Sequence, residues 1–512
     1  MEGLYLVFGE GLSEEANRLA QGLAQALLQN PPPGLWEAVP AYATLYLEYD
    51  PKRLSRRALL RLLRTVAPEG AGEGRVVEVP VRYDGEDLLE VVRRTGLSPE
   101  EVKRRHQAPL YRVYALGFTP GFPFLAPVDE ALRLPRRPHP RPRVPAHSLA
   151  MAGAQTGIYP LPSPGGWHLL GTALVAVYDP HREAPFLLAP GDRVRFREAE
   201  GPSPPEPNPL DLLPPSPRFP ALRVEEPGLL DLLLDGGRFR VGHLGLARSG
   251  PLDPYSAGVA NRLVGNPPGA PLLEFAYKGP ILTALRPLVA ALAGYGFVAL
   301  LDGEEIPPGQ SFLWPKGRAL RFRPKGKGVR AYLAVAGGLE ARPFLGSVSP
   351  DLRGRVGRPL RAGDVLGLKA VREARPGLAF PLRPLLEPFR LRLLPGPDAG
   401  REVVRAFLAA PFRVARVDRM GVELLGPGVP GGEGLSKATP LGGVQVPPSG
   451  RPLVLLADKG SLGGYAVPVR VAPEDLWLLG QVWPGAEIVF TCPGHREKDH
   501  VTLPWPPGGE DP

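Results

Sequence analysis

The sequence is poor in cysteine and methionine, and it lacks long apolar runs. Of its 512 residues, one is cysteine and three are methionine. The single cysteine, Cys492, excludes an intramolecular disulfide and a zinc site built from cysteine ligands. No run of about 18 apolar residues occurs, so we expect no membrane partner. The first residues lack a basic region followed by an apolar stretch, which predicts no signal peptide and a cytoplasmic protein.

Lysine is also scarce. Most of the 61 basic residues are arginine. Together with the proline-rich loops, this bias favours a thermophile or a GC-rich genome. The net charge of +9 is spread along the chain without a basic helix or an aromatic-basic run. We therefore expect no nucleic-acid partner. An anionic small-molecule substrate or an acidic partner explains the charge equally well.

Several catalytic signatures are absent. The chain has no Gly-x-x-x-x-Gly-Lys-Ser/Thr phosphate loop, no His-Glu-x-x-His and no Gly-x-Ser-x-Gly. It also has no Met-Lys dipeptide, the signature of a biotin carrier. Any nucleotide or biotin chemistry would thus need a different kind of site or a second protein.

Glycine and proline are abundant, with 63 and 68 residues, yet 43% of the chain is hydrophobic. Together these values favour a turn-rich β protein over disorder. A chain of this length should hold several domains. We predict a small α+β domain at 1–80, β-barrels at 81–200, 222–388 and 389–503, a proline-rich linker at 201–221 and a tail at 504–512. The first domain should contain helices over 13–29 and 54–66, one long strand over 36–49 and a last strand over 75–83.

Two helix starts and one repeat support this division. Ser98 begins a capping box with proline at the first helical position, and Asp253 has the same relation to Pro254. A Gly-Asp or Gly-Ala turn followed by a β-like run recurs at 190–196, 362–366 and 484–490. This recurrence predicts three related β units.

The stretch Gly117–Gly171 is dense in glycine, proline and aromatic residues and has no helical period. Ordering so much glycine is entropically costly, which favours a shaped pocket or an interface. His106 and Tyr111 lie just before it and form a candidate acid/base and hydrogen-bond pair. His106 could equally cap the end of its helix. His139, His147 and His168 are irregularly spaced and lack a carboxylate, so we predict no metal site.

Two further groups of polar residues are candidate sites. In the first, Ser249-Gly250 precedes a helix start, where a carboxylate or phosphate could bind. Arg238 and Asn261 accompany it, whereas Asp253 is suited to capping the helix. The second group suits an anionic or amide substrate, or an ordinary ion pair beside a β-turn. It contains Arg419, Gln445, Asp458, Lys459, Gly464 and Tyr465.

These motifs together resemble the KipI and KipA families, which are also known as the B and C subunits of 5-oxoprolinase. Residues 1–200 carry the KipI-like motifs and 222–491 the KipA-like motifs. The KipI-like residues are His106, Tyr111, Gly117-Phe118, Pro120-Gly121-Phe122, Pro135-Arg136, Pro142-Arg143, Gln155–Pro160 and Pro164–Trp167. The KipA-like residues are Asp235, Gly237-Arg238, Ser249-Gly250, Asp253, Asn261, Asn266, Leu273-Glu274, Gly346-Ser347, Asp418–Gly421, Gln445–Pro447 and Gly463–Tyr465.

The sequence departs from these families at four places. His147 stands where the KipI pattern has glycine, and Thr172 stands where it has arginine. In the KipA part, Leu234 replaces a glutamine and Val348 an arginine.

The resemblance implies tandem cyclophilin-like β-barrels in a mainly β protein with a small α+β N-terminal domain. It also implies an ATP-dependent 5-oxoprolinase that uses ATP and Mg²⁺ to open the lactam of 5-oxo-L-proline and needs the A subunit of 5-oxoprolinase as a separate chain. The expected catalytic residues are His106, as proton shuttle, and Tyr111, Arg238, Asp253 and Arg419. The expected substrate-binding residues are Phe118, Gly121, Phe122, Gln155, Tyr159, Trp167, Ser249, Asn261, Gln445, Asp458, Lys459, Gly464 and Tyr465.

Two alternatives stay open. KipI-like proteins resemble inhibitors of sensor histidine kinases, for which an exposed Phe118, Phe122 and Phe124 would anchor the interface. Alternatively, the chain resembles the carboxyltransferase-like part of biotin-dependent urea-processing enzymes and would use a biotin carrier in trans. A homo-oligomer is compatible with each hypothesis.

Overall fold

The computed structural model describes residues 1–66, 72 and 74–492, and it is built mainly from β-strands. The predicted tail at 504–512 lies outside the described residues, as does the end of the last predicted domain. None of the helices in these described ranges is long and apolar enough to cross a membrane.

A three-stranded sheet covered by two helices forms the N-terminal unit. The strand order is β1 (Glu2–Val7), β3 (Thr44–Tyr49), β2 (Leu35–Ala41), and apolar faces of α1 (Glu14–Gln29) and α2 (Arg56–Thr65) share its core. The prediction of one long strand over 36–49 was wrong, because the chain turns back between β2 and β3. Tyr42 makes this turn with a φ of 51°, and its ring packs against Tyr114 and Phe124.

A closed barrel follows. Its strands, in order around the barrel, are β11 (His168–Ala173), β4 (Val76–Arg82), β12 (Arg193–Glu198), β5 (Tyr111–Leu116), β6 (Pro123–Ala126), β9 (Gln155–Ile158) and β8 (Ser148–Ala152). The strand over 75–83 therefore belongs to the barrel and not, as predicted, to the N-terminal unit. The small pair β7 (Arg141–Val144) and β10 (Ser163–Gly165) lies outside the barrel ring.

Two helices, α3 (Leu88–Thr95) and α4 (Pro99–Gln107), accompany the barrel. The predicted start of α4 is confirmed, since the Ser98 side chain accepts a hydrogen bond from the Glu101 backbone N–H at 3.2 Å. The proline-rich segment after β12 contains no strand until β13 (Pro220–Glu226). It is nevertheless packed onto the protein, with Asp211 and Arg358 forming an ion pair at 2.8 Å.

Two sheets that share one apolar core form the next unit. One sheet has the order β19 (Glu304–Ile306), β18 (Phe297–Leu301), β21 (Ala319–Pro324), β16 (Ile281–Ala284), β13 (Pro220–Glu226), β23 (Val365–Gly367). The other has the order β14 (Leu230–Leu234), β15 (Leu272–Ala276), β22 (Arg330–Val335), β17 (Leu288–Gly294), β20 (Gln310–Trp314). Helix α5 (Pro254–Leu263) packs on β17 and β22 of this second sheet.

The last unit is an eight-stranded sheet whose row is closed by an additional pairing of β24 with β30. Its order is β24 (Phe389–Pro395), β31 (Glu487–Thr491), β25 (Phe412–Val417), β26 (Gly421–Leu425), β29 (Leu453–Leu455), β28 (Gly443–Val446), β30 (Leu462–Val471), β27 (Glu433–Ala438). Helices α6 (Arg401–Ala409), which the sequence did not predict, and α7 (Leu476–Leu479) also belong to it.

The predicted repeat corresponds to a shared strand arrangement in two of its three copies. In the N-terminal barrel, β12 pairs in parallel with β4 and antiparallel with β5. In the last unit, β31 pairs in parallel with β24 and antiparallel with β25. The middle copy differs, because β23 pairs with β13 antiparallel.

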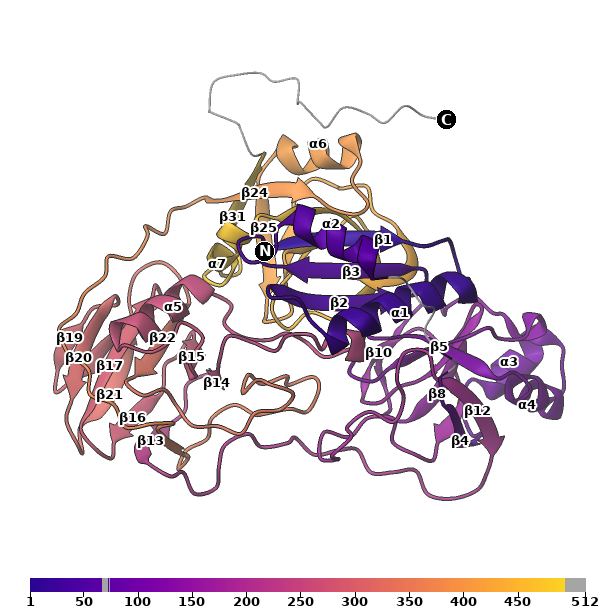
Figure 1. The fold of residues 1–512 in the computed structure, drawn as a ribbon, viewed down its shortest axis with the longest axis horizontal. Helices are drawn as coiled ribbons and strands as arrows, with labels where there is room; N and C mark the ends of the chain where they lie inside the picture. The colour runs from indigo at the N-terminus through magenta and orange to yellow at the C-terminus, as the bar shows by residue number, and fades with distance from the viewer. Residues whose placement is uncertain (67–71, 73, 493–512) are drawn as a thin grey trace.

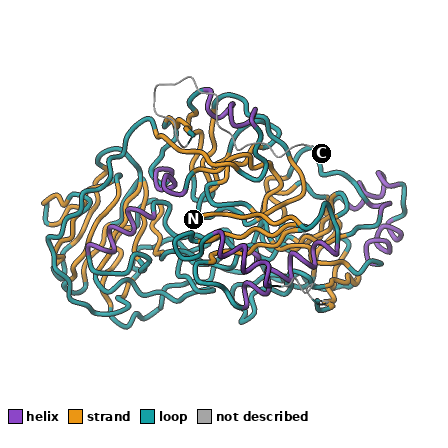
Figure 2. Tube along the Cα trace, turned by 45° about the horizontal axis from the view of Figure 1, so that its top comes forward, coloured by secondary structure: helices purple, strands orange, loops and turns teal. Residues whose placement is uncertain are grey.

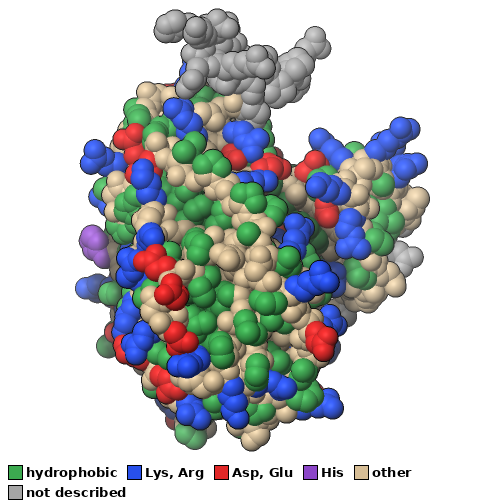
Figure 3. Space-filling view, turned by 90° about the vertical axis from the view of Figure 1, so that its left-hand side faces the viewer, with side chains coloured by type: hydrophobic (Ala, Val, Ile, Leu, Met, Phe, Trp, Pro, Cys, Tyr) green, Lys and Arg blue, Asp and Glu red, His purple; other side chains and the backbone are tan. Residues whose placement is uncertain are grey.

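The other three units meet around the small N-terminal sheet. Figure 1 shows this sheet in front of the C-terminal strands, with the first barrel on one side and the β13–β23 unit on the other. The tube in Figure 2 shows helix and strand layers from a second direction. A hydrogen bond of 2.6 Å from the Tyr5 hydroxyl to the Ala438 carbonyl joins the N-terminal sheet to the C-terminal unit. On the face in Figure 3, basic and acidic side chains are interspersed with hydrophobic ones.

Candidate functional site

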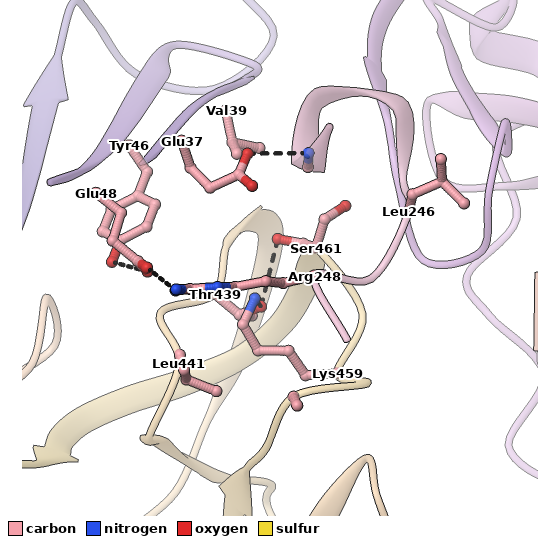
Figure 4. A pocket seen from close by; sticks show the side chains of 12 residues that line it. Glu37, Val39, Tyr46, Glu48, Leu246, Arg248, Thr439, Leu441, Lys459 and Ser461 are labelled. Carbon is pink, nitrogen blue, oxygen red and sulfur yellow. Dashed lines mark hydrogen bonds and ion pairs between the residues drawn. The ribbon is translucent and has the colours of Figure 1, made fainter. Parts of the chain in front are cut away.

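An enclosed cavity of about 30 Å³ lies where three distant parts of the chain meet, and we call it the junction cavity. It has room for about one or two water molecules. Figure 4 shows its acidic and basic side chains pointing toward one another from different elements. The lining residues are Glu37, Val39, Tyr46 and Glu48 from β2 and β3, Gly242, Leu246 and Arg248 from the segment after β14, and Thr439, Leu441, Ala457, Lys459 and Ser461 from the C-terminal unit.

Glu37 is a buried acid on β2. Its carboxylate accepts hydrogen bonds from the backbone N–H groups of Arg240 and Gly242, each at 3.0 Å. Burial raises the pKa of Glu37 to about 7, and the nearby carboxylate of Glu48 adds to this effect, although the Gly242 hydrogen bond opposes it. Glu37 can therefore exchange a proton near neutral pH.

Lys459 supplies the opposite kind of group from the loop after β29. Its Nζ atom donates to the Thr439 hydroxyl at 3.2 Å. Burial of the ammonium lowers the pKa of Lys459 to about 8, even though the carboxylates of Glu48 and Glu37 favour its charged form. Among the residues described by the structure, Lys459 has no salt bridge. The side chain thus keeps donors available for a ligand.

Arg248 and Ser461 complete the polar lining. Arg248 donates from Nη1 to Glu48 at 2.8 Å, and its guanidinium lies over the rings of Trp36 and Phe239. Cation–π contacts on both rings hold the side chain in place. The Ser461 hydroxyl is buried and has no hydrogen-bond partner within the described part of the chain. A buried polar atom without a partner is costly and is typical of a site that awaits a ligand or water.

A buried ion network supports the loop that carries Lys459. Arg419 donates from Nε to Asp458 at 2.8 Å, pairs with Glu274 through Nη1 and donates from Nη2 to the Gly250 carbonyl at 2.6 Å. Burial opposes ionisation of Glu274, but the charges of Arg419 and Arg330 outweigh it and lower the pKa of Glu274. Arg419 and Asp458 therefore position the loop and do not line the cavity themselves.

Two predicted catalytic residues of the KipA-like half have structural partners. Arg238 is fully buried, and its guanidinium donates to the carbonyls of Phe344 and Ser349 at 3.0 and 2.8 Å. Its guanidinium is thus engaged by backbone carbonyls inside the protein, and its catalytic role stays a prediction. Asp253 caps α5 as predicted, accepting from the Ser256 N–H at 2.9 Å.

His106 is a core residue of the first barrel. It is fully buried, its ring lies 2.9 Å from both the Tyr83 hydroxyl and the Thr156 hydroxyl, and it stacks on Phe196. Burial lowers the pKa of His106 to about 3, so the ring is neutral at any physiological pH. Tyr111 donates to the His106 carbonyl at 2.8 Å. Both residues are thus hydrogen-bonded inside the barrel core, and the proton-shuttle role of His106 stays a prediction.

The aromatic residues of Gly117–Gly171 form a packing cluster that joins the two halves of the chain. The buried cluster includes Phe122, Phe124, Tyr159 and Trp167, extends to Ala438 and Leu462 of the C-terminal unit, and has Phe118 packed against it. A side chain at Gly117 would place Cβ 2.3 Å from Leu462 Cγ. The prediction of exposed phenylalanines was therefore wrong, because the cluster is an internal seam.

The remaining predicted substrate-binding residues lie in several places. Gln155 donates to the Tyr42 hydroxyl at 2.5 Å, and Gly121 donates its N–H to the Leu244 carbonyl at 2.9 Å. Gln445 is buried on β28, whereas Gly464 and Tyr465 lie on β30, where Tyr465 is 41% exposed. None of these residues lines the junction cavity. Lys459 is the one predicted site residue among those that line it.

Ser249 and Asn261 line a second cavity, of about 260 Å³, that shares Arg248, Leu441 and Ala457 with the junction cavity. A third cavity, of about 820 Å³, lies between α1, the turn at 189–192 and the segment 239–245. Within the described ranges, no group of three or more His, Cys, Asp or Glu side chains is arranged to hold a metal ion.

Glu37, Glu48 and Arg248 were missed by sequence reasoning. A signal existed for the two glutamates, since each interrupts an apolar strand, in Leu-Trp-Glu-Ala-Val and Leu-Tyr-Leu-Glu-Tyr. A charged residue on a strand that is otherwise buried is uncommon and points to function. Arg248 carried no comparable signal.

Family models match both halves of the chain. Residues 1–188 match subdomains C and D of the carboxyltransferase domain, and 244–492 match subdomains A and B. The chain is 39% identical over 206 residues to the B subunit of 5-oxoprolinase from Bacillus subtilis, covering 37% of this chain and 86% of that protein. It is 34% identical over 281 residues to the C subunit of 5-oxoprolinase from Escherichia coli, covering 52% of this chain and 90% of that protein.

Two further proteins bear on the function. Urea amidolyase of Saccharomyces cerevisiae is 30% identical over 53% of this chain, which spans 16% of that larger enzyme. The crystal structure of a protein called TTHA0988 is 76% identical and superposes with a TM-score of 0.94 over 96% of this chain and 99% of that one. The same arrangement of all four units is therefore found in a crystal.

Proposed function

We propose that this chain, which belongs to the family of the B and C subunits of 5-oxoprolinase and carries both in one polypeptide, acts with a separate A subunit to open 5-oxo-L-proline to L-glutamate. The junction cavity carries this proposal. Glu37 and Glu48 come from the KipI-like half, and Arg248 and Lys459 from the KipA-like half. A site that needs both halves explains why they are joined in one chain.

The cavity offers the groups that lactam chemistry needs. Opening a lactam by hydrolysis adds water across the amide. The water oxygen attacks the carbonyl carbon and gives up a proton, negative charge builds on the amide oxygen, and the ring C–N bond breaks as the nitrogen takes up a proton. Glu37, with its pKa raised to about 7, can accept or return the proton, and the Lys459 ammonium and Arg248 guanidinium can stabilise the charge. Such displaced pKa values in an enclosed cleft are typical of catalytic groups.

Lactam hydrolysis is difficult at neutral pH. ATP is expected to activate the lactam by phosphorylating its amide oxygen. The junction cavity, at about 30 Å³, fits neither a nucleotide nor the whole lactam, so the lactam would lie beside it, in the adjoining cavity of about 260 Å³ that shares Arg248. We therefore expect ATP and its Mg²⁺ to bind outside this cavity, on this chain or on the A subunit. The residues of this chain then hold the lactam and move its proton.

The proposal is tested by mixing the purified chain with the separate A subunit, ATP, Mg²⁺ and 5-oxoproline and measuring glutamate. We expect glutamate only when both proteins and ATP are present. Lys459→Met should abolish its formation, whereas Lys316→Met, at an exposed lysine, should not. Glutamate from the chain alone, or none from the full mixture, contradicts the proposal.

A carboxyltransferase activity is the second candidate, favoured by the matching domain models and by the similarity to urea amidolyase. It would need a biotin carrier in trans. Transfer of labelled carboxylate from carboxylated biotin to urea or 5-oxoproline, without the A subunit, would support it. Docking on a histidine kinase is less favoured, because the phenylalanines that would anchor it are internal. A homo-oligomer stays a prediction.

A further inference from the structure

The second cavity, which we call the Ser249 cavity, lies on the other side of Arg248 from the junction cavity. Its volume is about 260 Å³, close to the lower end of the range for small-molecule sites. It is lined by Leu234, Asp235 and Gly236 after β14, Arg248, Ser249 and Pro251, Pro254, Ala257 and Asn261 of α5, Pro268, Gly269, Ala270 and Leu272, and Leu441 and Ala457 of the C-terminal unit.

Ser249 has the one side-chain oxygen of this lining that is buried without a hydrogen-bond partner in the described chain. The residue is 4% exposed, has a φ of 56°, and its backbone N–H donates to the Ala457 carbonyl at 3.0 Å. This left-handed conformation is uncommon for a residue other than glycine, and such strain gathers at functional sites. The fold therefore holds an unsatisfied hydroxyl at the cavity wall.

The other polar groups of the lining are already engaged or charged. Asp235 accepts from the hydroxyls of Ser347 and Ser349 and from the Val348 N–H, and Asn261 donates to the carbonyls of Pro268 and Ala270. Arg248 uses Nη1 for Glu48, and its other nitrogens make no hydrogen bond with the described residues. Donors are thus free at the Ser249–Arg248 end of the cavity.

Much of the rest of the lining is apolar. It includes Pro251, Pro254, Pro268, Ala257 and Leu272. A short apolar ring fits such a wall, whereas a second charge would lie there without a partner.

We propose that the Ser249 cavity binds a small cyclic carboxylate, with the carboxylate at the Ser249 hydroxyl and the Arg248 guanidinium and the ring against the prolines. This inference rests on the proposed function and assigns the cavity to its lactam substrate. Arg248, Leu441 and Ala457 line both cavities. The site of such a ligand therefore adjoins the cavity that holds Glu37 and Lys459.

Calorimetric titration of the full chain with 5-oxoproline, without ATP and without the A subunit, tests the inference. We expect binding to wild type and about 10-fold weaker binding to Ser249→Ala, the change that follows from loss of a hydrogen bond to a charged group. Alanine tolerates the same backbone conformation about as well as serine, so the melting temperature should be unchanged. 2-Pyrrolidinone, which lacks the carboxylate, should bind at least about 10-fold more weakly than 5-oxoproline.

A second variant blocks the cavity from its mouth. A Cβ atom at the exposed Gly269 would lie 3.7 Å from Gly236, an ordinary contact, so Gly269→Leu should fold and abolish binding. Gly258→Ala, on α5 where a Cβ meets nothing within 4 Å, is the matched control and should bind as wild type.

The outcomes separate this inference from the proposed function. Binding that Ser249→Ala and Gly269→Leu leave unchanged overturns the inference, as does no binding to wild type or binding of inorganic phosphate in place of 5-oxoproline. Glutamate formation in the full mixture could still stand in each case. If instead 5-oxoproline binds through Ser249 but no glutamate forms with the A subunit, the site stands and the proposed function fails.

Discussion

Glu37 and Glu48 stand directly opposite each other in the register of β2 and β3, beside a β-bulge at Trp36. Like charges facing each other across a strand pair destabilise a sheet, and bulges are frequent where a side chain is re-aimed toward an active site. Arg248 neutralises Glu48, which leaves Glu37 as the member with the raised pKa. The sheet thus holds one carboxyl group, that of Glu37, whose pKa is raised to about 7.

Replacing Glu37 by glutamine should reduce glutamate formation by about 100-fold or more, because a general acid or base contributes factors of about 10² to 10⁴. The amide oxygen can still accept one of the two N–H groups of Arg240 and Gly242, which donate to different carboxylate oxygens in the wild type, so the variant should fold with some loss of stability. Steady-state assays of the full mixture measure the effect, with Glu304→Gln at an exposed site as control. Activity within about twofold of wild type would exclude Glu37 from the chemistry.

The same residue should make stability depend on pH. The pKa of Glu37 is about 7 in the folded protein against 4.5 for the free side chain, so the folded state binds more protons between these values. The stabilising contribution is complete below pH 4.5 and is lost as the pH rises through 7. Relative to Glu37→Gln, the wild-type free energy of unfolding should fall by about 1–3 kcal/mol from pH 5 to pH 8. Denaturant titrations at both pH values measure it, and parallel curves for the two proteins would contradict it.

Activity should follow a narrow bell-shaped pH profile. Glu37 must lose its proton, near pH 7, and Lys459 must keep its own, which is lost near pH 8. The maximum should therefore lie between these values, with kcat/KM falling on both sides. In Glu37→Gln the acid limb should disappear from the residual activity while the alkaline limb remains. An acid limb that survives this substitution would assign the lower pKa to another group.

Local patterns predicted the local features well. The sequence signal lies within a few neighbouring residues for the capped starts of α4 and α5 and for the recurring final strands. Such signals are local because a cap acts within one helical turn and a turn spans only a few residues. The hairpin between β2 and β3 was missed because its turn residue is Tyr42, held in the left-handed region by aromatic packing and not by glycine.

The site was harder to predict than the fold. Glu37, Arg248 and Lys459 lie about 200 residues apart along the chain, and only the packing of the units brings them to one cavity. The motif residues that did stand out, such as His106 and Arg238, are fully buried and stabilise the core. A residue that is specific to a family can thus serve packing, and burial decides between the two roles.

The seam between the two halves depends on a missing side chain at Gly117. Its Cβ would lie 2.3 Å from Leu462 Cγ, so Gly117→Ala should destabilise the protein by about 1–3 kcal/mol, as overpacking usually does. The double variant with Leu462→Ala should be less destabilised than the sum of the two single variants, because the truncated side chain makes room for the new Cβ while its own burial is lost. Thermal unfolding of the single and double variants measures the coupling, with Gly400→Ala as control because a Cβ there meets only Val403 at 3.9 Å. Additive effects would show that the two residues do not meet.

Arg419 should control Lys459 without touching the substrate. Its guanidinium joins Asp458, Glu274 and the Gly250 carbonyl, so Arg419→Met leaves the buried Asp458 carboxylate without its cation and leaves Glu274 paired with Arg330 alone. Breaking such a pair costs about 3–5 kcal/mol, and the loop that carries Lys459 loses its anchor.

A merely structural role would lower stability and leave the kinetics of the folded fraction unchanged. A positioning role should in addition lower kcat and move the alkaline limb of the pH profile away from 8, because Lys459 then sits in a different environment. Pairing Arg419→Met with Asp458→Asn, which removes the stranded charge while Glu274 keeps its ion pair with Arg330, should restore folding but not kcat. Full recovery of kcat in that double variant would show that Arg419 serves stability alone.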